Sequence, residues 1–256
     1  MKHFYDKCVE IYDDYRAVVP SYAAAALSFY LLLIIVPAFS LVAVGTSLLN
    51  IDMSLIENII QQIVMPEYSA MIIDVLESRS VNTVALVTMI ISIYTVSRGV
   101  GNIYEISKNM YQEDRDESLI SYYIYTFKVT IFLLLLFIGI IAVMALGPLA
   151  YIFNILYSLF VFCLMSIYMI VPRIRTHHSD AFQGALVASA LMLVLYYGLN
   201  IYFQFADFQS VYGPLSFIVV ILFVFDWAAE IFYIGMYITN LLHLRRKEDE
   251  KRTSRN

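Results

Sequence analysis

Six long hydrophobic stretches, separated by short polar segments, account for most of the chain. A helix of about 20 apolar residues crosses the hydrocarbon core of a bilayer. One stretch, residues 81–96, is shorter, but apolar residues keep a helical spacing through residues 97–111 and predict a longer helix. The pattern predicts an all-α polytopic membrane protein with six transmembrane helices in a single membrane domain. These helices are expected at residues 22–49, 81–96, 124–146, 149–171, 181–203 and 215–242.

The polar segment between the first two predicted spans, residues 50–80, has an amphipathic pattern of its own. Leu55, Ile59 and Ile63 lie on one helical face, and Pro66 separates this helix from a second short one. The pattern predicts a short amphipathic helical hairpin outside the membrane. Such a hairpin serves either as a lid or partner-binding element, or as a helix that lies on the bilayer surface or caps the bundle.

Positively charged residues fall almost entirely on one side of the predicted membrane. Fifteen of the sixteen Lys and Arg residues lie before the first span, between alternate spans, just inside the third span or after the sixth, and Arg79 is the exception. Because Lys and Arg are enriched in cytoplasmic loops, both termini are predicted to be cytoplasmic. The charged tail, residues 243–256, is then expected to be a topology anchor with a solvated, frayed end.

Composition supports the membrane class and offers little enzyme chemistry. Hydrophobic residues make up 61% of the chain and charged residues 14%, against about 25% charged residues in soluble domains. The sequence has no Gly-rich phosphate loop, nucleophile elbow or HExxH motif, and its two Cys and four His residues show no metal-ligand spacing. We therefore expect no enzymatic activity, no cofactor and no metal site. The basic residues follow the positive-inside pattern, so they do not indicate nucleic acid as a partner.

Two acidic residues near the middle of the last predicted span, Asp226 and Glu230, form the main candidate site. They are four residues apart, so they lie on one face of a helix. An acidic side chain at bilayer depth costs about 2.5 kcal/mol or more, and such residues usually pair or line a polar path. Arg98 and Lys128, near the cytoplasmic ends of the second and third spans, are the candidate partners. The sequence leaves open whether these residues form a structural ion-pair lock or a relay for a proton, cation or substrate.

Short motifs spread over residues 22–242 resemble the YihY/BrkB family of bacterial inner-membrane proteins, which formerly carried the label ribonuclease BN. They are AALSFY with a following proline, SRG, N-x-Y, VPRIR, DAFQGA, YG and two positions of the last span. The matching residues are Tyr30, Pro37, Ser97, Arg98, Asn109, Tyr111, Pro172, Arg175, Asp180, Gly184, Tyr212, Gly213, Trp227 and Gly235. The resemblance implies six helices in the bacterial cytoplasmic membrane, with both termini in the cytoplasm. The residues speak against the ribonuclease label, because the chain shows neither a metal cluster nor a basic groove for RNA.

The chain departs from the family pattern at two positions. The last span reads Gly235-Met236-Tyr237 where many members have Gly-Ala-Glu, and Glu230, two helical turns earlier, is the candidate replacement for that acid. Ile34 stands where members often have Ser.

The resemblance also bears on function, because one member has been associated with resistance to serum killing and another with lipid export. The expected function is a transporter or a lipid-handling protein that exports or flips lipids. Its expected partners are membrane lipids and a lipid, small-molecule or ion substrate. The alternative is a structural or interaction protein of the cell envelope that transports nothing.

Overall fold

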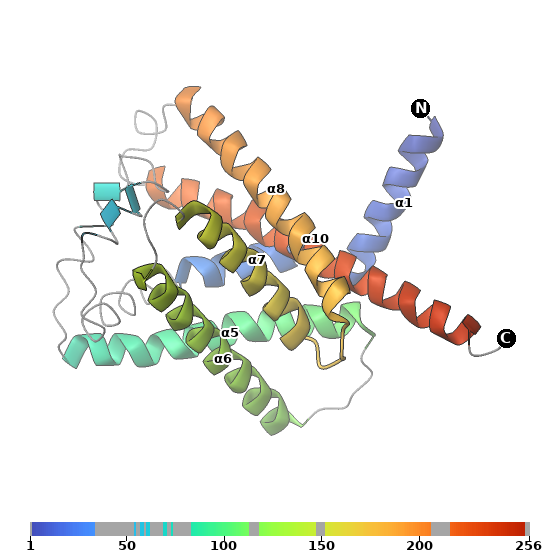
Figure 1. Cartoon of the computed structure of the whole chain (residues 1–256), viewed down its shortest axis with the longest axis horizontal. Helices are drawn as coiled ribbons and strands as arrows, with labels where there is room; N and C mark the ends of the chain where they lie inside the picture. The colour runs from blue at the N-terminus through green and yellow to red at the C-terminus, as the bar shows by residue number, and fades with distance from the viewer. Residues whose placement is uncertain are drawn as a thin grey trace.

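The computed structural model describes residues 2–33, 83–112, 118–146, 152–205 and 216–253, with isolated residues between 54 and 73. All regular structure in these ranges is helical. The long helices are α1 (Lys2–Val18), α5 (Thr83–Met110), α6 (Leu119–Leu146), α7 (Ile152–Ile170), α8 (His178–Phe205) and α10 (Ser216–Thr253), as Figure 1 shows. A further helix, Tyr22–Leu33, follows α1 after a bend of 59°.

Three described helices are long and apolar enough to cross a membrane: α6, α8 and α10. The bent pair formed by α1 and the helix Tyr22–Leu33 adds a fourth if it acts as one span, and the described part of α7 is apolar but shorter. The helix expected to run from residue 81 through residue 111 is α5, which ends at Met110. The all-α membrane class is confirmed for the described residues, while the six spans and their orientation stay predictions.

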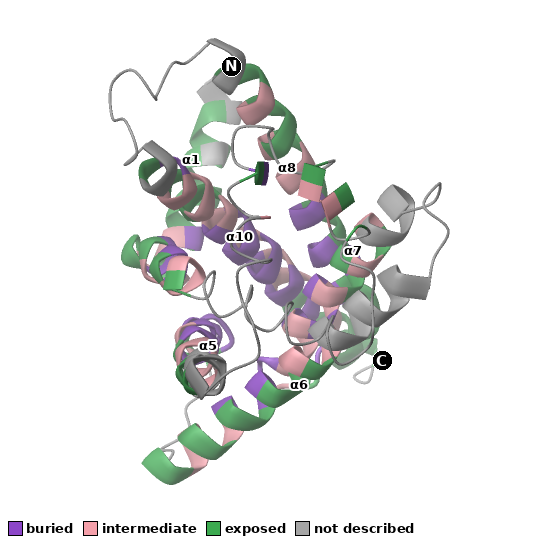
Figure 2. Ribbon diagram, turned by 90° about the vertical axis from the view of Figure 1, so that its left-hand side faces the viewer, coloured by how far each residue is buried: buried purple, intermediate pink, exposed green. Residues whose placement is uncertain are grey.

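α10 is the central helix of the bundle, and its middle is the most buried part of the molecule in Figure 2. Side chains of two neighbouring helices fix its position. The Tyr233 hydroxyl of α10 donates a hydrogen bond to Oδ1 of Asn102 in α5 at 2.9 Å. The hydroxyl of Tyr168 in α7, which is fully buried, donates to the Phe232 carbonyl of α10 at 2.8 Å. These bonds satisfy polar groups inside the bundle and set the register of α10 against both helices.

Close backbone packing joins α8 and α10. A Cβ atom on Gly184 of α8 would collide with the Thr239 side chain and the Gly235 carbonyl of α10. A Cβ atom on Gly235 would collide with the Tyr168 hydroxyl and the Ala188 side chain. Small residues at such contacts let transmembrane helices approach closely, and van der Waals packing then holds the pair. The other small residues of α8 that are fully buried are Ala181, Ala185 and Ser189.

α10 continues well past the predicted end of the last span. The sequence predicts a topology anchor with a solvated, frayed end for residues 243–256, whereas the helix runs to Thr253. An ion pair between Arg246 and Asp180 of α8 holds the first turn of this charged segment. Opposite charges four residues apart, such as Glu248 and Arg252, favour the helix further along. The tail is therefore helical and not frayed as far as Thr253, and its role as a topology anchor stays a prediction.

Several predicted features lie outside the described residues. They are most of the external hairpin at residues 50–80, the later part of the first span with Ile34 and Pro37, and the motif residues Tyr212 and Gly213. The hairpin, whether a lid or a surface helix, therefore stays a prediction.

Candidate functional site

The two acids of α10 have different surroundings in the structure. Glu230 makes an ion pair with Arg16 of α1, with 2.7 Å between Oε1 and Nη2 and 3.5 Å between Oε2 and Nη1. Each of these side chains is about a quarter exposed, and Asp226 is exposed. The partner of Glu230 is therefore Arg16 and not Arg98 or Lys128, the partners expected from the sequence.

Packing between α1 and α10 brings this ion pair together. Tyr15 is buried, and its ring meets that of Tyr237 edge to face at 5.4 Å between centroids. The Arg16 guanidinium lies 5.3 Å from the ring centre of Tyr12, and its Nε donates to the Tyr12 hydroxyl at 3.2 Å. A guanidinium held by a carboxylate, a hydroxyl and an aromatic ring has little freedom. The geometry favours the structural lock over the relay for Glu230.

A cavity of about 790 Å³ lies between α5 and α6, beside the helix Tyr22–Leu33. Arg98, Asn102 and Glu105 line it from one face of α5, at positions i, i+4 and i+7, and Lys128 lines it from α6. Most of the remaining lining is aromatic or aliphatic and includes Tyr30, Tyr94, Tyr122, Ile124 and Phe127. The cavity thus combines two cations and one anion with an apolar and phenolic wall.

The walls of the α5–α6 cavity are held in place by specific contacts. Asn102 accepts the hydrogen bond from Tyr233 of α10, so this part of α5 is tied to the centre of the bundle. A Cβ atom on Gly101 would collide with the Tyr122 hydroxyl, so glycine allows the close approach of α5 and α6. Lys128 is nine residues into α6, about 14 Å along its axis. On α6 the cavity therefore extends from Tyr122 to Lys128, into the apolar part of the helix.

A second groove, of about 650 Å³, lies between α8 and α10. Its lining includes Leu195, Tyr202, Trp227 and Ile231, and Glu230 is the one charged residue among the described residues that line it. Such a lining offers a surface to hydrocarbon chains rather than to polar groups.

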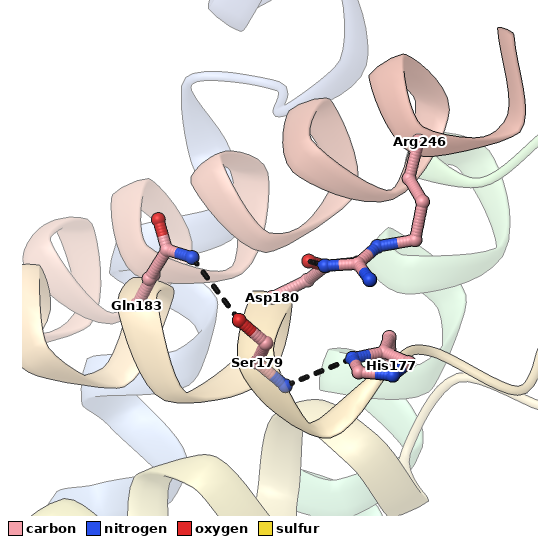
Figure 3. Close-up of polar contacts among 5 residues, drawn as sticks. All are labelled: His177, Ser179, Asp180, Gln183 and Arg246. Carbon is pink, nitrogen blue, oxygen red and sulfur yellow. Dashed lines mark hydrogen bonds and ion pairs between the residues drawn. The ribbon is translucent and has the colours of Figure 1, made fainter. Parts of the chain in front are cut away.

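The start of α8 is fixed to the end of α10 by a paired charge (Figure 3). Two nitrogen atoms of Arg246 contact the two carboxylate oxygen atoms of Asp180 at 2.6 and 3.2 Å, and the Asp180 side chain is 2% exposed. Asp180 lies in the first turn of α8, where the helix dipole also favours a negative charge. Nδ1 of His177 accepts the Ser179 N–H at 3.3 Å and so caps the helix.

Two buried polar side chains of α10 face the end of α5. Asn240 donates from Nδ2 to the Met110 carbonyl at 2.9 Å, while its Oδ1 and the Nε2 of His243 have no hydrogen-bond partner among the described residues. Burial and the nearby Lys247 lower the pKa of His243, and Asp180 partly offsets this effect. The surroundings therefore favour the neutral form of the His243 ring. No group of three or more His, Cys, Asp or Glu side chains in the described part of the chain is placed to hold a metal ion.

Comparison with known proteins identifies the family. A family model for the virulence factor BrkB matches residues 11–256, which is nearly the whole chain. The chain belongs to the BrkB family. No curated protein and no solved structure matches it. The resemblance read from the motifs is thus confirmed, and the family description names no catalytic activity.

Motif residues of this BrkB-family chain meet at two places. Tyr30, Ser97 and Arg98 line the α5–α6 cavity, although they lie on two different helices. Gly184 and Gly235 lie at the crossing of α8 and α10. Of the other motif residues that the structure describes, Tyr111, Pro172 and Asp180 are buried, and Asn109, Arg175 and Trp227 are exposed.

The structure gives contacts to several residues at or near these places that the sequence did not predict. Arg173, within the VPRIR motif, lies 4.2 Å from the ring centre of Tyr125 and donates to the Ser121 carbonyl at 3.3 Å. Asn102 and Glu105 follow Arg98 at helical spacing, a signal that a search for polar faces on α5 would have found. Arg16 gives no comparable local signal.

Proposed function

We propose that this BrkB-family protein handles an amphiphilic molecule with an anionic head group, such as a phospholipid, in the bacterial cytoplasmic membrane. The α5–α6 cavity binds the head group, and the molecule passes between the cavity and the bilayer during transport or export. In the predicted six-span topology, with both termini in the cytoplasm, Arg98 and Lys128 lie in the cytoplasmic half of the membrane.

The observation that supports this proposal is the presence of two basic side chains in one largely aromatic and aliphatic cavity. Arg and Lys at bilayer depth are costly unless they meet water or an opposite charge. Glu105 offsets only one of the two positive charges of Arg98 and Lys128. A phosphate or carboxylate head group supplies the second negative charge and accepts their hydrogen bonds. The apolar part of the same molecule contacts the surrounding wall.

The acids of α10 have no part in head-group binding in this proposal. Glu230 fastens α1 to α10 through Arg16 and is not a carrier of a proton or cation. Asp226 does not line the α5–α6 cavity, so its neutralisation should leave head-group binding unchanged.

Binding of fluorescent phosphatidylglycerol and phosphatidylcholine to the purified full-length protein tests this proposal. Arg98→Gln and Lys128→Gln should each weaken binding of the anionic lipid roughly tenfold, the value of one charge-assisted hydrogen bond. Binding of the zwitterionic lipid should change little. Arg175→Gln is the matched control, because Arg175 is exposed, basic and outside the cavity.

Movement of the same labelled lipids across the bilayer of proteoliposomes separates handling from binding. The wild-type protein and Arg175→Gln should accelerate movement of the anionic lipid, and the two cavity variants should not. Equal binding of both lipids by all variants, with no accelerated movement, would contradict the proposal and favour a structural or interaction protein of the envelope.

A further inference from the structure

One face of α1 carries exposed hydrophobic side chains although α1 precedes the first predicted span. Tyr5, Val9 and Tyr12 are 69%, 39% and 56% exposed. Their spacing of four and three residues, followed by Arg16 four residues later, places all four on one helical face. The contact between Arg16 and Tyr12 confirms that these two side chains share it. Glu10 lies about 160° round the helix from Tyr12, and Ile11, which is 53% exposed, lies outside this face.

Two contacts with α10 show which way this face of α1 is turned. Tyr15 meets Tyr237, whereas Arg16 reaches Glu230, seven residues earlier in α10. Seven residues correspond to about 10 Å along a helix. The charged end of α10 begins at Arg245 and belongs at a membrane surface, so Glu230 lies deeper than Tyr237. The face of α1 that bears Arg16 is therefore turned towards the hydrocarbon.

The direction of α1 agrees with a position along the membrane surface. The bend of 59° between α1 and the helix Tyr22–Leu33 allows the second helix to enter the bilayer while α1 does not continue its direction. Figure 1 shows α1 leaving the other labelled helices, with its N-terminal end away from them. On the following helix, Tyr22 and Phe29 are 65% and 53% exposed, so the apolar surface continues into a predicted span.

We propose that α1 lies in the plane of the membrane and that its Tyr5–Val9–Tyr12 face contacts lipid at the boundary between head groups and acyl chains. Tyrosine is favoured at this depth because its ring is apolar and its hydroxyl is polar. The opposite face, with Glu10, points to water. Three bases against four acids make α1 slightly acidic, so apolar burial and not attraction to anionic lipid holds it there. This inference does not depend on what the α5–α6 cavity binds.

Tryptophan fluorescence in vesicles that contain brominated phosphatidylcholine tests the position of α1. The chain has a single Trp, so Trp227→Phe provides a dark background. In that background, Tyr12→Trp places the probe on the lipid face and Glu10→Trp places it on the opposite face. Brominated lipid should quench the Tyr12→Trp variant roughly twofold more than the Glu10→Trp variant, and aqueous acrylamide should show the reverse order.

Two results would overturn the proposal. If acrylamide quenches both variants equally and brominated lipid quenches neither, α1 extends into water. If brominated lipid quenches both equally, α1 crosses the bilayer together with the helix Tyr22–Leu33. Tyr5→Trp in the same background repeats the lipid-face measurement. Tyr5 lies near the opposite end of α1 from Arg16, so this variant leaves the ion pair undisturbed.

Discussion

Arg16 and Glu230 join two segments that are 214 positions apart in the chain. Their two nitrogen–oxygen contacts hold α1 against α10 where both side chains are about a quarter exposed. An ion pair of this kind is weak evidence for net stabilisation, but removal of one partner leaves the other without compensation. The pair therefore specifies where α1 docks.

Neutralising one member of this pair should destabilise the protein. Arg16→Gln or Glu230→Gln should each lower the free energy of unfolding by about 1–3 kcal/mol, because one charge is left without its partner. The double variant should lose less than the sum of the two single losses. Thermal unfolding of the detergent-purified variants measures this coupling. Asp226→Asn changes an exposed neighbour and should leave the free energy of unfolding nearly unchanged. Strictly additive losses in the Arg16 and Glu230 double variant would show that these two charges do not interact.

Gly184 and Gly235 give a second prediction for single residues. Gly184→Ala and Gly235→Ala should each destabilise the protein by about 1–3 kcal/mol, because the added methyl group overlaps with α10 or α8. Gly198→Ala is the control within α8, since a Cβ atom there meets nothing within 4 Å. This control should be neutral or stabilising because alanine favours the helix. If all three variants unfold at the same temperature, the close crossing is wrong.

At the scale of the element, the charged segment of α10 is a helix because other elements hold it. Arg246 is tied to Asp180 at the start of α8, and Asn240 is tied to the end of α5 through the Met110 carbonyl. His243 lies between these two contacts, follows the last predicted span and is 6% exposed. His243 is therefore enclosed where α5, α8 and α10 meet.

The free energy of unfolding should fall as the pH is lowered through the range in which His243 becomes protonated. Its pKa in the folded protein is below the ordinary value of about 6.5, so below pH 6.5 the unfolded chain binds the proton more tightly than the folded one. The contribution of His243 to the free energy of unfolding should be constant above pH 6.5 and should decline below it. His243→Gln should remove this component when unfolding is followed from pH 8 to pH 5. The charged groups that act on His243 are Lys247, Asp180, Glu250 and Arg246. An unchanged pH dependence in the variant would assign the decline to other residues.

At the scale of the whole molecule, the positive-inside pattern makes a prediction that the described helices do not test. Reporter fusions or cysteine labelling at Thr253 and at Tyr68 should report opposite sides of the membrane, with Thr253 in the cytoplasm. Two reporters on the same side would contradict the six-span topology. A fusion after Val18 should report the same side as Thr253 and serves as the internal reference.

Local properties of the sequence predicted helices well, whereas contacts between distant helices were harder to predict. The span expected at residues 181–203 is α8, His178–Phe205, because apolar length alone determines whether a segment suits a bilayer. Arg98 and Lys128 were expected to be partners of the α10 acids, whereas both line the cavity between α5 and α6. No local pattern encodes the partner of Glu230, because Arg16 lies in a segment that reads as a polar arm before the membrane.

The crossing of α8 and α10 also limits which parts of the protein can move. With no side chain between their backbones at Gly184 and Gly235, these two helices pack closely against each other, and the hydrogen bond from Tyr168 attaches α7 to this pair. Asn102 attaches α5 to the same pair. α6 is attached near its start, where the Tyr125 hydroxyl donates to the Ile170 carbonyl at the end of α7. We therefore expect the α5–α6 cavity to widen by rotation of α6 about the contact between Tyr125 and Ile170. The other helices should stay in place during this movement.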